Sequence, residues 1–145
     1  MTQPVLTLLA SPPSGMPGTN IEVMQANQVT VVIPKGDLSA ASGAELKRML
    51  EDLLENGNTR LVVDMERVGY IDSAVWGELV MAAARVRSAG GELRVCALCS
   101  ELLAVLTMIR LSQVMAVFTT REHAMVFDAD PEKHLGLAER QAVRS

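Results

Sequence analysis

Residues 60–77 constrain the fold more than any other stretch of this 145-residue chain. The apolar run Leu61-Val62-Val63 stops at Asp64, and a second apolar segment, 68–71, stops at Asp72-Ser73. A long alanine-rich segment follows at once. This pattern predicts a buried strand, then a turn, then a helix that has Ser73 at its N-cap.

A serine at the start of a helix lies beside free backbone N–H groups and the positive end of the helix dipole. Ser73 can therefore accept a phosphate without local strain, and the added charge would change what the surface binds. The simpler interpretation is a helix cap and nothing more, worth about 1 kcal/mol over alanine. The residues alone leave both interpretations open.

Strands and helices alternate along the rest of the chain. The pattern predicts a hairpin of strands 21–24 and 29–33, further strands over 61–64, 92–97 and 114–118, and helices from Ser39 or Ser42 to 55 and over 73–88, 100–109 and 120–127. This order predicts an α/β domain with a mostly parallel sheet of four or five strands and about four helices. The functional surface of such a fold usually lies at one end of the sheet, where Ser73 is expected.

The two ends of the chain have a different character. Residues 1–19 are rich in Pro, Gly and Ser and predict a flexible leader, 20–128 form the domain, and 129–145 are a polar tail or a short helix. No Lys or Arg precedes the apolar patch 5–10, so we expect no signal peptide and a cytoplasmic protein. No apolar run reaches the ~18 residues of a membrane span. A net charge of −4 with scattered Lys and Arg argues against nucleic-acid binding.

The order of these signals resembles a STAS domain, the fold of bacterial anti-sigma-factor antagonists, over residues 20–128. The resemblance rests on the order and spacing of several short sequence features, here called the register, rather than on one motif. Its elements are Asp64 at a strand end, Asp72-Ser73 at a helix start, Gly36-Asp37-Leu38 after the hairpin, Gly90-Gly91 before a strand, and Thr120 with Ala124 in the last helix.

The resemblance implies a non-enzymatic switch that regulates transcription. Antagonists of this family bind a serine kinase that doubles as an anti-sigma factor, and phosphorylation of the serine in the Asp-Ser pair releases them. By position that serine is Ser73. We expect the partner-binding surface to include Asp72, Asp37, Glu78 and Met81, although Asp37 is equally well explained as a turn residue. The kinase would supply the ATP, and no cofactor or metal is expected for this chain. A homodimer is possible.

The segment after Ser73 departs from the family pattern. Antagonists usually continue Asp-Ser with Ser or Thr, then Gly, Leu and Gly, whereas this chain has Ala74, Val75, Trp76 and Gly77. We expect Val75 to obstruct a partner that approaches this backbone closely, and Trp76 either to fill the core or to anchor an interface. The alternative is a STAS scaffold or lipid-transporter accessory without a phosphorylation switch.

Cys96-Ala97-Leu98-Cys99 lies between a predicted strand and a predicted helix, which is the place of a thioredoxin-like motif. The Ala-Leu spacer supplies no Pro or Gly turn, and no Trp precedes Cys96. We therefore expect structural thiols and keep a dithiol oxidoreductase as the enzymatic alternative. A zinc site would need two more ligands, and the spacing of His123 and His134 does not argue for one.

Overall fold

The computed structural model describes residues 20–127, so the predictions for 1–19 and 129–145 lie outside the described residues. Ten elements follow one another along the chain: β1 (Ile21–Ala26), β2 (Val29–Pro34), α1 (Ala40–Glu55), β3 (Arg60–Asp64), α2 (Ser73–Ser88), β4 (Glu92–Cys96), α3 (Ser100–Met108), the 3-10 helix η1 (Leu111–Gln113), β5 (Ala116–Phe118) and α4 (Arg121–Ala124). Their order is the predicted hairpin followed by alternating helices and strands.

The five strands form one sheet in the order β1-β2-β3-β4-β5. β1 pairs with β2 antiparallel, and every later pair is parallel. The prediction of an α/β domain with a mostly parallel sheet of four or five strands and about four helices is therefore confirmed. Successive parallel strands need a crossover, and the helices supply it.

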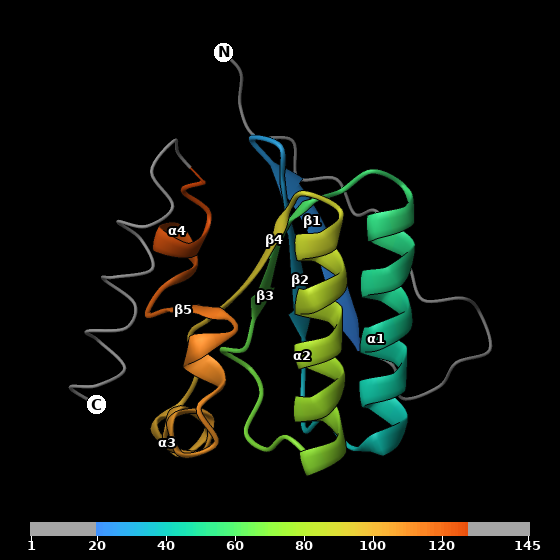
Figure 1. The fold of residues 1–145 in the computed structure, drawn as a ribbon. Helices are drawn as coiled ribbons and strands as arrows, with labels where there is room; N and C mark the ends of the chain where they lie inside the picture. Colours follow the sequence, from blue (N-terminus) through green and yellow to red (C-terminus); the bar gives the residue numbers. More distant parts are fainter. Residues whose placement is uncertain (1–19, 128–145) are drawn as a thin grey trace.

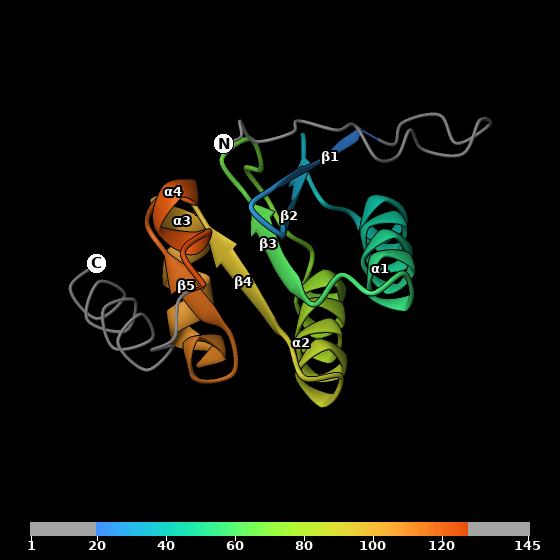
Figure 2. The same ribbon diagram turned by 90° about the horizontal axis from the view of Figure 1, so that it is seen from above.

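Helices cover the two faces of the sheet unequally. α1, α2 and α3 contribute the buried leucines and valines of the larger apolar cluster, together with one face of the strands. Figures 1 and 2 show α1 and α2 lying side by side along this face. A smaller cluster on the other face contains Val31, Val62 and Phe118 and packs against Ala124 of α4. Within residues 20–127, no helix is long and apolar enough to cross a membrane.

The helix ends follow local chemistry. Ser39 caps α1 through a capping box in which Ser39 and Ser42 bond each other's backbone N–H. Of the two capping residues that the sequence allowed, Ser39 is therefore the N-cap. The helix ends before Gly57, whose φ of +91° suits only glycine.

The last two elements are shorter than the sequence predicts. β5 begins at Ala116 rather than 114, because Val114 and Met115 close the turn after η1 by donating to Leu111 O. α4 ends at Ala124 rather than 127. The cause is Arg94 of β4, which is 1% exposed and donates to the carbonyls of Ala124 and Val126.

Candidate functional site

The start of α2 is capped by Asp72, not by Ser73. The Asp72 carboxylate accepts a hydrogen bond of 3.0 Å from Ala74 N, and Ser73 is the first residue inside the helix. The prediction of Ser73 as the N-cap is therefore wrong. Asp and Ser are equally good N-cap residues. Asp72 precedes Ser73 by one position, and its carboxylate takes the capping role. Ser73 is exposed, and no residue of the described chain hydrogen-bonds its Oγ.

The segment that leads to Ser73 is held against the segment after β2. Leu38 N donates to Tyr70 O over 2.8 Å, and Asp72 N donates to Leu38 O over 2.9 Å. Leu38 and Ile71 thus form an isolated parallel bridge, and both side chains are buried. Two backbone hydrogen bonds and two buried side chains therefore fix this loop. The main chain around Ser73 is preorganised before any partner arrives.

Asp37 lies at the same end of the sheet. Its Oδ1 is 3.7 Å from the position that a Cβ on Gly69 would occupy, so the carboxylate lies against the loop before α2. The Asp37 carbonyl accepts a hydrogen bond from Ser42 Oγ at the start of α1. The structure therefore brings Asp37, Asp72 and Ser73 to one edge of the sheet. Neither carboxylate forms an ion pair with a residue in the described part of the chain.

The two large residues after Ser73 point into the protein. Val75 is 1% exposed and Trp76 is 4% exposed. Val75 fills the space that Gly43 leaves in α1: a Cβ at Gly43 would lie 2.3 Å from Val75 Cγ2. The expectation that Val75 obstructs an approaching partner is therefore wrong, and of the two roles open to Trp76 the structure selects core packing. The exposed residues at the start of α2 are Ser73, Ala74 and Gly77.

The other two predicted contact residues differ in accessibility. Met81 is 56% exposed on the outer side of α2, the side that also carries Gly77. Glu78 is partly buried, and its Oε1 has no hydrogen-bond partner among the described residues. Arg85, two turns further along α2, forms an ion pair with Glu51 of α1. Because residues seven apart share a helix side, Glu78 faces the seam between α1 and α2 rather than the surface around Ser73.

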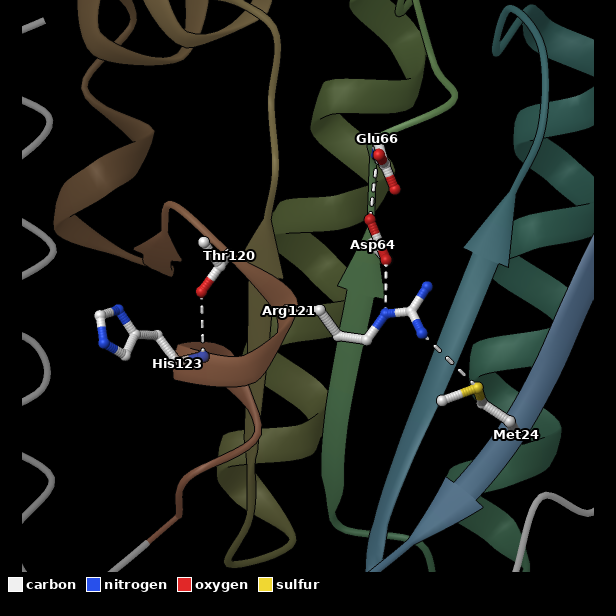
Figure 3. Close-up of polar contacts among 6 residues, drawn as sticks. All are labelled: Met24, Asp64, Glu66, Thr120, Arg121 and His123. Atoms are coloured by element: carbon white, nitrogen blue, oxygen red, sulfur yellow. Dashed lines mark hydrogen bonds and ion pairs between the residues drawn. The ribbon is translucent and has the colours of Figure 1, made fainter.

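A second polar cluster, which the sequence did not indicate, lies at the end of β3 (Figure 3). The Asp64 side chain is 2% exposed and accepts from Arg121 Nε over 2.7 Å and from Glu66 N over 3.0 Å. Arg121 Nη1 reaches Met24 Sδ at 3.8 Å, so the guanidinium spans from β3 to β1. Met24 of β1, Asp64 of β3 and Arg121 of α4 are far apart in the sequence but in contact here. Only the folded structure shows this cluster.

A hollow of about 430 Å³ adjoins this cluster, lined by Asp64, Glu66, Ala97, Thr119, Thr120, Arg121 and Glu122. The ion pair already neutralises the buried carboxylate of Asp64, and Thr120 Oγ is engaged in accepting from His123 N. The arrangement therefore fastens α4 to the end of β3. Within residues 20–127, no three His, Cys, Asp or Glu side chains gather where they could hold a metal ion.

The comparison with known protein families agrees with this geometry. A family model described as "STAS domain" matches residues 20–124, which is most of the chain. The chain belongs to the STAS-domain family. The family that the sequence resembles over residues 20–128 is thus confirmed.

Solved structures of other STAS-fold proteins resemble this chain. An anti-sigma factor antagonist from Mycobacterium paratuberculosis superposes with a TM-score of 0.67 at 17% identity, over 73% of this chain and 90% of that one. The phosphorylated form of SpoIIAA, a Bacillus cell fate determinant, gives 0.60 at 17% identity, over 73% and 96%. A sulfate transporter family protein from Wolinella succinogenes gives 0.59 at 19% identity, over 82% and 90%. At these identities the likeness establishes the fold.

The two cysteines of this STAS domain lie on different sides of the sheet. Cys96 belongs to the smaller apolar cluster with Val62 and Phe118, whereas Cys99 packs against the larger one. Both are free thiols. Burial, and then the negative charge of Asp64, raise the pKa of Cys96 above its ordinary value. A raised thiol pKa suppresses the thiolate that dithiol exchange needs, which weighs against the oxidoreductase alternative.

Proposed function

We propose that this chain is an anti-sigma-factor antagonist, a non-enzymatic switch that regulates transcription in a bacterial cytoplasm. Unphosphorylated, it binds a serine-kinase anti-sigma factor; phosphorylated at Ser73, it is released. The observation that carries this proposal is the exposed Ser73 hydroxyl at the first residue of α2. Asp72 caps the helix, so the Ser73 hydroxyl does not. Ser73 lies at the same edge of the sheet as Asp37 and Asp72.

The charge of a phosphate supports the release step. A phosphoserine carries about −1.5 to −2 at neutral pH. At Ser73 it would join Asp72 and Asp37 at an edge where neither has a cationic partner among residues 20–127. The positive end of the α2 dipole tolerates this charge within the domain. An interface built around a neutral hydroxyl does not, because repulsion and unpaired buried charge cost several kcal/mol.

The departures from the family pattern leave the proposed surface nearly unchanged. Val75 and Trp76 are buried, so of the replaced positions only Ala74 alters what a kinase touches. Alanine is smaller than the usual Ser or Thr and creates no obstruction. The likeness to a sulfate transporter family protein keeps a transporter accessory as the second candidate, in which Ser73 has no phosphorylation role.

A comparison of two aspartate variants tests the proposal. Ser100 is the exposed first residue of α3, so it occupies in its helix the position that Ser73 occupies in α2. Affinity purification from the native cell, read by mass spectrometry, should retrieve a serine-kinase anti-sigma factor with wild type and Ser100→Asp but not with Ser73→Asp. Retrieval of transporter subunits by all three proteins would favour the second candidate instead.

A further inference from the structure

Tyr70, the only tyrosine of the chain, stands out on the surface beside Ser73. Its side chain is 55% exposed, whereas the neighbouring Val68 and Ile71 are 2% and 5% exposed. The hydrogen bond from Leu38 N to Tyr70 O holds the main chain in place. The fold therefore presents an aromatic ring to solvent from a rigid backbone, three residues before the proposed phosphorylation site.

The exposed residues that neighbour Tyr70 in the sequence and at the start of α2 are small, the Asp37 carboxylate lies close by, and Arg67 is exposed in the same loop. Gly69 before it has no side chain, and Ala74 and Gly77 on the exposed start of α2 have small ones. The Asp37 carboxylate lies against Gly69 and has no ion-pair partner among residues 20–127. An exposed ring with a carboxylate nearby is complementary to an apolar pocket with a basic side chain next to it.

We propose that Tyr70 is the anchor of the partner interface. Its ring enters an apolar pocket on the kinase anti-sigma factor, and a basic side chain of that kinase faces Asp37. The identity of the occupant rests on the proposed function; the anchoring role rests on the exposure and the rigid backbone of Tyr70. A tyrosine has only two side-chain torsions, and its backbone is already ordered, so binding costs little conformational entropy. Aromatic anchors of this kind dominate the energetics of protein interfaces.

The proposal is tested by binding to the purified serine-kinase anti-sigma factors encoded in the same genome, measured by calorimetry. Tyr70→Ala should raise the Kd of the kinase that binds by roughly 30-fold, and Tyr70→Phe should retain most of the affinity. Val126→Ala is the matched control, because Val126 is 45% exposed and follows α4. It should change the Kd by less than about threefold. The fluorescence of the buried Trp76 reports whether each variant is folded.

Nitration of tyrosine gives a second readout, since the chain has one tyrosine. Tetranitromethane should modify Tyr70 readily in the free protein and slowly in the complex. If Tyr70→Ala binds like wild type, or nitration is equally fast in the complex, the anchor is overturned while the Ser73 switch stands. If Ser73→Asp binds like wild type and Tyr70→Ala does not, the anchor stands and the switch fails. If wild type binds none of the kinases, the proposed function itself fails, and the anchor falls with it.

Discussion

Replacement of Gly43 by alanine should loosen the contact that sets α2 against α1. An alanine Cβ would lie 2.3 Å from Val75 Cγ2 and 3.3 Å from Val75 Cβ and Cγ1. Carbon atoms pack best at roughly 3.5–4.0 Å, so the helices must separate by about 1 Å or Val75 must leave its position. Overpacking of this kind costs about 1–3 kcal/mol, and the higher helix propensity of alanine returns up to about 1 kcal/mol. We expect a net destabilisation of about 1–2 kcal/mol.

Urea unfolding followed by the fluorescence of Trp76, the only tryptophan, measures this change. Gly77→Ala is the matched control in α2, because a Cβ there meets nothing within 4 Å, and it should stabilise the domain. Combining Gly43→Ala with Val75→Ala should destabilise by at least about 1 kcal/mol less than the sum of the single changes, because the second substitution removes the clashing methyls. A Gly43→Ala protein as stable as wild type, or strict additivity in the pair, would refute the reasoning.

Three further predictions concern the second face of the sheet. Arg121→Met should destabilise the domain by about 2 kcal/mol because it leaves the buried Asp64 carboxylate unpaired, and adding Asp64→Asn should recover part of that loss in urea unfolding. Ala97 has a φ of +62°, so Ala97→Gly should raise the midpoint of urea unfolding, with a gain of up to about 1 kcal/mol; an unchanged midpoint would mean that the backbone there is unstrained. Burial raises the pKa of Cys96 in the folded protein. The buried thiol therefore contributes fully to the free energy of unfolding below the pKa of an unfolded thiol, about 8.5. This contribution is lost as the pH rises above that value. Unfolding free energy should therefore fall between about pH 8.5 and 10 in wild type, and fall less in Cys96→Ala.

Periodicity predicted most of the fold because the boundaries of most helices and strands are marked by residues within or next to the element itself. β3 ends at Asp64 and α2 spans Ser73–Ser88, as the apolar run and the alanine-rich segment indicated. Both boundaries are marked by a change from apolar to capping residues, and such changes are visible in one sequence. The last helix was predicted too long because the contacts of Arg94 that end it come from a distant strand. The last strand was predicted too long because Val114 and Met115 close the turn after η1.

The sequence named the residues of the candidate site but did not predict their geometry. Asp72 and Ser73 are both good caps and stand side by side, so local propensity does not choose between them; the structure chooses Asp72. The inward direction of Val75 depends on Gly43 in another helix, thirty-two positions earlier, which no local pattern reveals. Tyr70 lies in the segment 68–71, which the sequence presents as apolar, but its exposure follows from the bridge between Leu38 and Ile71. These are tertiary effects, and each changes what a partner can touch.

The central claim is that a kinase anti-sigma factor phosphorylates Ser73. It is tested most directly by incubating the purified protein with that kinase and ATP and measuring intact mass and phosphopeptides. The account predicts one phosphate on wild type and on Ser100→Ala, located at Ser73, none on Ser73→Ala, and loss of kinase binding as the phosphate appears. A phosphate at another residue, or a Ser73 phosphate that leaves kinase binding unchanged, would contradict it.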